Sequence, residues 1–339
     1  MQSRRVAITD IAQELSLSVG TVSNALNGKV GQVSKETVER VLETARRMGY
    51  TRNPAAAALR SGRSHVVSLH VPPSVRSLSF YMEFTVGVVN ELADRDLDVL
   101  MVTGAGRGGH QRQRVDGTIV VDWLPHQDWA EAMRADSGPV VCAGRPAVRG
   151  ASPDRVVEID YPTLVRQMME RTIQDGAQRP LMIAPDRRFQ SSWAQSIEQG
   201  FRTAVSAAGH TPAVVPAPVD ATADEILNVV DLAVSQNRPD AILFGPQRFA
   251  GIAHLARGWG RADSEIPWVA SCAGDPLSEL GVPGITAIDT RPRDFGARCA
   301  QELWGLLSRG TPVASTEDVD ESRLVQQPAD IIWSVRLRR

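Results

Sequence analysis

The side chains best suited to touch a base edge or a phosphate gather in one short stretch, residues 18–27. The amide of Asn24 can bond an adenine edge in two places, and the methyl groups of Val19 can meet a thymine methyl. Gly20 leaves the backbone bare beside them. Nearby hydroxyl and amide groups can hold phosphate oxygens, which sets register without reading sequence. The chemistry available here is that of nucleic-acid contact.

Two short helices should position this stretch. Thr9 and Ser18 can each cap a helix, because a hydroxyl oxygen can accept a backbone N–H of the first turn. Apolar residues at helical spacing give each helix an inner face: Ile11, Ala12 and Leu15 on the first, Val22 and Leu26 on the second. Helices separated by so few residues must cross steeply, as in a helix-turn-helix. The second helix would then present its first turn to the major groove.

A third helix and a weakly supported segment follow. Ser34 is expected to begin the third helix, and Gly49 to lie just past its end. Val38, Leu42 and Ala45 are expected to form its inner face. Residues 53–63 then contain a short helix former with almost nothing to pack against. So short a helix is marginal in water unless a partner supports it.

In order and closely, these segments resemble the lactose-repressor (LacI) family of bacterial transcriptional regulators. The matching residues are Asp10-Ile11-Ala12, the stretch 18–27, Val33-Ser34-Lys35-Glu36-Thr37, and Asn53-Pro54-Ala55-Ala56 with Leu59-Arg60-Ser61-Gly62. The resemblance implies a helix-turn-helix headpiece over residues 1–51 and a hinge helix over residues 52–63. It also implies that the hinge helices of two subunits fold together on DNA.

The resemblance also assigns contacts. Val19, Gly20 and Asn24 match positions that read bases, and Ala56 and Leu59 match the hinge that enters the minor groove. An apolar wedge such as Leu59 would unstack a base step and kink the duplex. The positions that match phosphate contacts are Ser18, Thr21, Ser23, Asn27, Thr37, Tyr50 and Asn53. The plainer interpretation of Ser18 and Thr21 is that they only cap a helix.

Charge is distributed unevenly along the chain. Residues 1–63 hold ten basic and five acidic side chains, a net charge of +5, whereas the remainder carries −7, which together give the chain's −2. A basic head on an acidic body is typical of a protein that binds phosphates with one end. Double-stranded operator DNA is therefore the expected partner.

Composition excludes several other classes. No apolar stretch approaches the ~18 residues of a membrane span, and no apolar export signal is found, so a cytoplasmic protein is expected. Cys142, Cys272 and Cys299 are far apart and form no CxxC pair, which fits reduced thiols. The six His residues form no HxH or HxxxH pair. No metal and no cofactor are expected.

The rest of the chain, residues 64–339, alternates apolar runs with amphipathic stretches. Strands are predicted at 66–71, 99–102, 118–121, 140–143, 156–159, 181–184, 241–244, 268–270 and 285–288. Helices are predicted at 83–93, 163–174, 192–208 and 223–234. Such alternation indicates parallel sheets covered on both faces, and so many strands favour two lobes. The family resemblance implies a two-lobed α/β effector and dimerisation domain that resembles a periplasmic sugar-binding protein, with lobe 1 at about 64–162 and 291–322 and lobe 2 at about 163–290 and 323–339.

The body matches the family through looser landmarks and departs from it at the cleft. The landmarks are Phe80-Tyr81-Met82-Glu83 with Gly87, Val115-Asp116-Gly117-Thr118-Ile119, Gly144-Arg145-Pro146, Gln199-Gly200-Phe201-Arg202 and Pro292-Arg293-Asp294-Phe295-Gly296. Sugar-gripping positions of many members are replaced here by Ile197, Gly245-Pro246-Gln247 and Gly274. Because each buried sugar hydroxyl needs a partner, these losses argue against an ordinary monosaccharide.

Other side chains remain as candidates to line an effector cleft: Phe80, Tyr81, Asp122, Arg145, Trp193 and Asp275. Core packing is an equal alternative for Trp193. Arg187 and Arg188 could serve an anionic ligand, although a solvated pair is the plainer interpretation.

One segment of the first lobe is short and rich in glycine. Residues 103–114 occupy the place of a full helix in relatives and spell GxGxxG at Gly104, Gly106 and Gly109. A dinucleotide site needs a helix with an apolar stripe after that loop, and the residues that follow are polar and basic. A flexible, shortened loop is the preferred interpretation.

Two versions of a DNA-binding regulator remain open, and a third class, an enzyme, has no support. No serine elbow, P-loop or carboxylate pair tied to a nucleophile is found. In the first version the protein is a repressor that binds a palindromic operator as a dimer, and a small molecule, a sugar or another metabolite, alters its affinity. In the second the body has lost sugar binding and serves as a dimeriser or protein-interaction platform. In the family that the chain resembles, a leucine-heptad tail makes some members tetramers; none follows the last strand here, so the resemblance implies a homodimer.

Overall fold

The computed structural model describes two compact units, Met1–Ser64 and His65–Arg339. The residues described are 6–26, 32–50, 63–72, 79–103, 114–124, 138–148, 151–186, 188–189, 191–261, 264–272, 284–309 and 321–333. The hinge, with Asn53, Ala56 and Leu59, lies outside these residues, as do Asn27, Arg187, Asp275 and the glycine-rich loop 104–113. Each unit is built around its own hydrophobic core.

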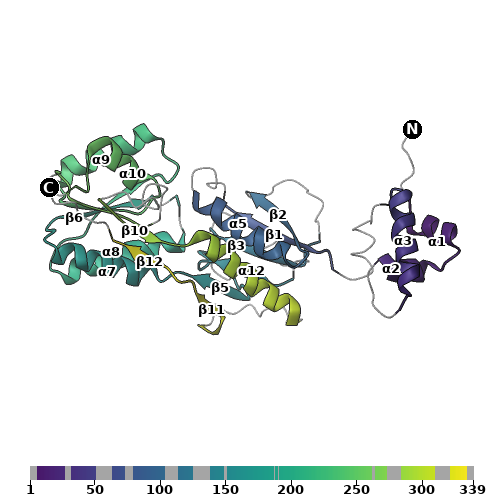
Figure 1. Ribbon diagram of the computed structural model, residues 1–339. Coiled ribbons are helices and arrows are strands. Elements are labelled where there is room, and N and C mark those ends of the chain that lie inside the picture. Colours follow the sequence, from purple (N-terminus) through teal and green to yellow (C-terminus); the bar gives the residue numbers. More distant parts are fainter. Residues whose placement is uncertain are drawn as a thin grey trace. The chain divides into compact units, whose positions relative to one another are not determined.

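In the described residues of the N-terminal unit lie the helices α1 (Ile8–Leu15), α2 (Val19–Leu26) and α3 (Lys35–Arg47), which are drawn in purple in Figure 1. Their core consists of Ile11, Ala12, Val22, Ala25, Val41 and Ala45. Ser34 caps α3 by accepting the Thr37 N–H, and Gly49 follows the helix with a φ of 66°, as predicted. This arrangement is the helix-turn-helix expected from the sequence.

Two local predictions in this unit are wrong. Thr9 does not cap α1, because the helix begins earlier, with Ala7 as its N-cap and the Asp10 carboxylate accepting the Ala7 N–H at 2.8 Å. Leu42 does not lie on the inner face of α3, since its side chain is 39% exposed and Val41 is fully buried instead. Adjacent apolar residues left the face of α3 ambiguous by one position, and packing against α1 and α2 selected Val41.

The second unit contains two six-stranded sheets, as its alternating pattern predicts. The first sheet has the order β11-β5-β4-β3-β1-β2, with strands β1 (Val66–Val71), β2 (Asp98–Thr103), β3 (Gly117–Val121), β4 (Val140–Ala143), β5 (Arg155–Glu158) and β11 (Leu324–Gln326). All its pairings are parallel. A short 3-10 helix, Glu321–Arg323, leads into β11.

The second sheet has the order β12-β10-β9-β8-β6-β7. Its strands are β6 (Pro180–Pro185), β7 (Ala213–Ala217), β8 (Ala241–Phe244), β9 (Trp268–Ser271), β10 (Ile285–Asp289) and β12 (Asp330–Ile332). The β10–β12 pair is antiparallel and the others are parallel. The sequence did not predict β7, β11 or β12. Pro216 lies within β7, and proline is tolerated there because β7 is an edge strand.

Helices cover both faces of the second sheet (Figure 1). On one face lie α7 (Tyr161–Gln174) and α8 (Ser192–Ala207), and on the other α9 (Ala223–Asn237) and α10 (Phe249–Arg257). Strand β6 serves both faces, since Leu181 and Ile183 pack with α9 and α10 whereas Met182 and Ala184 pack with α7 and α8. Because both faces of such a strand are buried under helices, every residue along it can be apolar, and its sequence is a continuous apolar run.

Helices α5 (Ser79–Ala93) and α12 (Pro292–Arg309) pack on the first sheet and on each other, although they are about two hundred residues apart in the chain. Two glycines allow their backbones to meet. A Cβ placed on Gly87 would lie 2.0 Å from the Arg293 carbonyl oxygen, and one on Gly296 would lie 2.0 Å from the Phe84 carbonyl oxygen. The two landmarks that contain these glycines therefore form one helix contact.

The last crossover between the two sheets falls later than expected. Strand β11 belongs to the first sheet and β12 to the second, so the chain crosses between Gln326 and Asp330 and not near residue 322. The first crossover lies between β5 and α7, and another lies between β10 and α12. Three crossovers place the C-terminal ends of the parallel strands of both sheets around one cleft.

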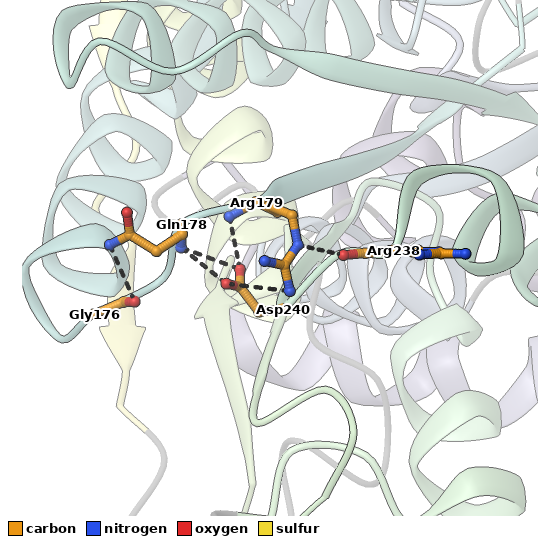
Figure 2. Close-up of polar contacts among 5 residues, drawn as sticks. All are labelled: Gly176, Gln178, Arg179, Arg238 and Asp240. Atoms are coloured by element: carbon orange, nitrogen blue, oxygen red, sulfur yellow. Dashed lines mark hydrogen bonds and ion pairs between the residues drawn. The ribbon is translucent and has the colours of Figure 1, made fainter.

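At the N-terminal ends of β6 and β8, away from the cleft, Asp240 links the two segments that lead into these strands (Figure 2). Its carboxylate accepts the backbone N–H groups of Gln178 and Arg179, at distances down to 2.8 Å. The Arg179 guanidinium donates to the Arg238 carbonyl oxygen at 2.6 Å and faces Asp240 at 4.0 Å. These contacts join the segments that lead into β6 and β8, so their role is structural. In the part of the chain that the structure describes, no helix is long and apolar enough to cross a membrane.

Candidate functional site

The first turn of α2 forms the candidate DNA-contacting surface. Ser18 Oγ accepts the Thr21 N–H at 3.0 Å and lies 2.8 Å from Thr21 Oγ1, which confirms the predicted cap. Val19 is 41% exposed and Gly20 is also exposed, and a Cβ on Gly20 would meet Ser18 Oγ at 3.7 Å. The cap thus satisfies the helix end while the next two residues face outward. A hydroxyl that caps a helix can still accept or donate a bond to a phosphate.

The other residues predicted to contact DNA in this unit differ in burial and in the role they play in the fold. Asn24 lies one turn after Gly20 on the same side of α2, and Asn24 and Ser23 are half-buried. Thr37, in the first turn of α3, lies 2.9 Å from Ser34 Oγ, so it too takes part in a cap. Tyr50 packs against the core of the unit. The structure therefore groups Ser18, Val19, Gly20, Thr21 and Asn24 on one short helix.

A second candidate site is the cleft between the two sheets of the body. Its open space is about 830 Å³, and its lining includes Phe80, Tyr81, Asp122, Arg145 and Trp193, which are five of the six side chains expected there. The sixth, Asp275, lies outside the described residues. The sequence did not point to other lining residues, namely Val121, Ala143, Gly144, Glu158, Ile159, Tyr161, Ser192, Ser196, Val219 and Phe295. Several of these follow the C-terminal ends of parallel strands, where ligands bind in α/β sheets, and that rule was the available signal.

Asp122 is the most perturbed acid of the cleft. It follows β3 in the left-handed conformation, with a φ of 49°, and only 8% of the residue is exposed. The Tyr81 hydroxyl donates to Asp122 Oδ2 at 2.5 Å, and the Trp193 indole also donates to this carboxylate. Burial raises the pKa of Asp122 from 3.8 to about 6, and the two hydrogen bonds only partly oppose this shift. The carboxylate is therefore costly to keep charged at this buried position.

The cation of the cleft is already neutralised. Arg145 makes a two-pronged contact with Glu158, with Nε and Nη2 at 2.8 and 3.0 Å from its carboxylate oxygens. Such a pair fixes the guanidinium in one orientation. Arg188, outside the lining, pairs with Asp186 and is 82% exposed in its side chain, which agrees with the solvated alternative.

Gln247 and Ser79 form a hydrogen bond across the cleft. Gln247, in the turn between β8 and α10, donates from Nε2 to Ser79 Oγ, at the start of α5, over 2.9 Å. Gln247 and Pro246 also line the cleft, so this substituted turn still faces the ligand space. Ile197, by contrast, is fully buried in the core between α7 and α8. The position that carries a sugar-gripping arginine in many relatives is thus core here.

Trp193 combines the two roles considered for it. Its ring lies 5.5 Å from Phe189 and 6.5 Å from Tyr161, centroid to centroid, and it is also part of the cleft lining. Packing orients the ring, and the indole N–H donates a hydrogen bond to Asp122. Core packing and cleft lining are therefore not exclusive at this residue.

A helix-turn-helix unit followed by two α/β lobes around a cleft defines a DNA-binding protein with a periplasmic-binding-protein-like domain. Comparison with known proteins agrees with this class. Residues 7–53 match the family described as bacterial regulatory proteins, lacI family, and residues 169–327 match a periplasmic binding protein-like domain. Residues 7–53 therefore form a LacI-type helix-turn-helix domain, and the body contains a periplasmic-binding-protein-like domain.

Individual relatives are similar over different spans. The transcriptional regulator pepR1 of Lactobacillus delbrueckii subsp. lactis is 30% identical over 55% of this chain, which spans 57% of the relative's length. Catabolite control protein A of Priestia megaterium is 24% identical over 95% of this chain and 96% of its own length. The Lac repressor dimer bound to operator and an anti-inducer has the same fold, with a TM-score of 0.76 and 17% identity over 97% of this chain and 98% of that one.

Proposed function

We propose that the protein regulates transcription by binding a palindromic operator as a homodimer, most simply as a repressor. The observation that carries this proposal is the outward-facing first turn of α2, where Val19 and Gly20 are exposed beside a capped helix end. A recognition helix reads bases with these first residues. The roles of Ser23, Asn24, Asn27, Thr37, Tyr50 and Asn53, and of Ala56 and Leu59 in the hinge, are part of the same proposal. It places the protein in the bacterial cytoplasm, where operators lie.

Exposed apolar side chains on the body support the homodimer. Met82 and Val89 on α5 are 56% and 40% exposed, and Leu100 and Met101 on β2 are 37% and 41% exposed. Strand β2 is an edge of the first sheet, so this face can meet a second copy. Leu255 on α10, in the other lobe, is 70% exposed. A two-fold dimer requires a surface that pairs with the same surface of the second copy.

The cleft supports regulation by a small molecule. Its lining is rich in aromatic and apolar side chains, as in ligand sites, and buried Asp122 gives it a directional polar group. A ligand that binds one arrangement of the lobes better than another would shift operator affinity by that difference. The presence of this cleft weighs against the alternative in which the body is only a dimeriser or interaction platform.

Selection of bound fragments from random DNA by the purified full chain tests the proposal. An enriched palindrome with a central kinkable step is the expected result, and the absence of any palindrome would overturn it. Asn24→Ala should alter base preference more than the salt dependence, because phosphates carry the salt term. Leu59→Ala should reduce DNA bending and leave dimerisation intact. Leu232→Ala, at a leucine of α9 that is 57% exposed, is the matched control and should change neither property.

A further inference from the structure

The charges of the cleft are unequal. Among the lining residues that the structure describes, Asp122 and Glu158 are acidic and Arg145 is basic. Arg145 and Glu158 neutralise each other across 2.8 and 3.0 Å, which leaves the buried Asp122 carboxylate as the charge that a ligand would meet. A negatively charged ligand would be repelled by this carboxylate, and the described lining offers it no cation outside the Arg145–Glu158 pair.

The Asp122 carboxylate has room for further hydrogen bonds. An ionised carboxylate accepts at about four lone-pair sites, and Tyr81 and Trp193 each fill one. Both donors come from aromatic residues that line the same cleft. A ligand group that donates a hydrogen bond to Asp122 would therefore lie beside the rings of Tyr81 and Trp193.

Aromatic rings line the cleft from both lobes. Phe80, Tyr81 and Phe295 form one group, with Phe80 5.4 Å from Tyr81 and 6.2 Å from Phe295 between centroids. Tyr161 and Trp193 form the other, 6.5 Å apart. The first group comes from α5 and α12, and the second comes from α7 and α8. A flat molecule can contact both groups when the lobes close on it.

We propose that the cleft binds an aromatic amine, with its ring between the two aromatic groups and its ammonium group on Asp122. Rings and a carboxylate together favour a cation, because an aromatic face attracts positive charge and a charge-assisted hydrogen bond is stronger than a neutral one. The proposal rests on the assignment of the cleft as the effector site and names its ligand class.

The polar groups of the cleft fit a polyhydroxylated sugar less well. Arg145 and Glu158 bond each other, and Gln247 bonds Ser79. Each sugar hydroxyl that is buried needs a donor or acceptor, and these pairs already use part of the hydrogen-bonding capacity of the lining. Ser192 and Ser196 add two hydroxyl groups on one helix. These few hydrogen-bonding groups suit an amine, which has one polar end, better than a sugar, which carries hydroxyl groups around its ring.

The proposal also predicts a dependence on pH. Asp122 faces Tyr81 from α5, Trp193 from α8 and Tyr161 from α7, and the Arg145–Glu158 pair lines the same cleft. Burial raises the pKa of Tyr161, so it stays neutral near Asp122. With the pKa of Asp122 at about 6, amine binding should weaken as the pH falls through that value and the carboxylate takes up a proton.

Three indole probes that share one ring test the ligand class: tryptamine, the neutral alcohol tryptophol and indole-3-acetate. Calorimetry with the full chain well above pH 6 should give tryptamine an affinity about tenfold higher than tryptophol, from the greater strength of a hydrogen bond to a charged group. Indole-3-acetate should bind more weakly than both. Cellobiose and glucose serve as sugar comparisons. Tighter binding of a sugar or of indole-3-acetate, or no binding of any indole, would overturn the proposal.

Asp122→Asn is the matched variant, because asparagine has the same shape and tolerates the left-handed backbone at this position. It should bring the affinities of tryptamine and tryptophol within about twofold of each other and remove the pH dependence of tryptamine binding. An unchanged preference for tryptamine would contradict the role of Asp122. If the variant does not fold, the pH dependence of the wild-type chain decides the same point.

Operator binding is measured separately with the ligand-free chain. If an operator is bound and no indole enters the cleft, the ligand class is wrong while the proposed regulator stands. If tryptamine binds with the expected preference and no operator is found, the ligand class stands and the regulator proposal fails.

Discussion

The two candidate sites of this protein are built in opposite ways. The residues proposed to contact DNA, Ser18, Val19, Gly20 and Thr21, lie in a row at the start of α2. The cleft collects side chains from α5, β4, β5, α7, α8, α12 and the turns after β3 and β8. Chemistry that one helix positions can be read from adjacent residues, whereas chemistry that several crossovers assemble can be read only from the fold.

The two sites also differ in electrostatics. Ser18 and Thr21 are neutral and lie at the surface of a basic segment. Asp122 is buried with a raised pKa in an acidic body. The basic segment attracts phosphates over long distances, which suits a DNA-binding surface. A buried carboxylate with a raised pKa suits a ligand-binding cleft.

The largest expected effect comes from the helix contact that supports the cleft. Gly296→Ala would place a Cβ 2.0 Å from the Phe84 carbonyl oxygen, so α5 and α12 must separate, at a cost of about 3 kcal/mol of unfolding free energy. Hydrogen exchange should show lost protection in the body and unchanged protection in the Met1–Ser64 unit.

Gly305→Ala on the same helix is the control for this prediction. A Cβ on Gly305 meets nothing within 4 Å, and alanine is favoured over glycine in a helix by about 1 kcal/mol. This variant should be at least as stable as the wild type. Equal destabilisation by the two variants would show that helix packing is not the cause.

An intermediate effect is expected at Asp122. Its folded pKa of about 6 exceeds its ordinary value of 3.8, so the folded chain binds the proton more tightly and stability falls as the pH rises between these values. Asp122→Asn removes the charge and should raise the unfolding free energy by about 1–3 kcal/mol above pH 6. Denaturant unfolding at several pH values measures this.

Near pH 4 the gain from Asp122→Asn should vanish, because the wild-type carboxyl is then protonated in the folded state. A stability difference that does not change with pH would point to altered hydrogen bonding with Tyr81 and Trp193 and against a desolvated charge.

The smallest effect compares one helix cap from each region. Ser18 caps α2, and Thr222 caps α9 with a reciprocal bond from its N–H to Glu225 at 2.8 Å. Ser18→Ala and Thr222→Ala should each lower the stability of their own unit by about 1 kcal/mol. Only Ser18→Ala should also weaken DNA binding, which a filter or fluorescence titration measures. Equal DNA affinity in the two variants would show that Ser18 only caps α2 and does not contact a phosphate.

Local signals predicted most of the fold. Continuous apolar runs correctly predicted β1, β4 and β8 to the residue, and caps at Ser18 and Ser34 correctly placed two helices. The errors arose where two local signals competed. Asp10 outcompeted Thr9 in fixing the start of α1, and either Val41 or Leu42 could have continued the face of α3.

The cleft was only partly predictable. Phe80, Tyr81, Asp122, Arg145 and Trp193 were correctly expected to line it, but the neutralisation of Arg145 by Glu158 and the bond from Gln247 to Ser79 were not. These pairs join residues 13 and 168 positions apart, and neither spacing corresponds to a local structural period. A partner at such a distance is set by sheet order and crossovers.

The sequence by itself determined the DNA-binding architecture, the alternation of strands and helices, and the opposite charges of head and body. Each follows from neighbours in the chain: a hydroxyl three residues before an N–H, an apolar residue every third or fourth position, or a count of charges. The tertiary structure decided which face of α3 is buried and which charge of the cleft remains unneutralised. It did so because packing and pairing depend on distances in space, and those are fixed only once the sheets have formed.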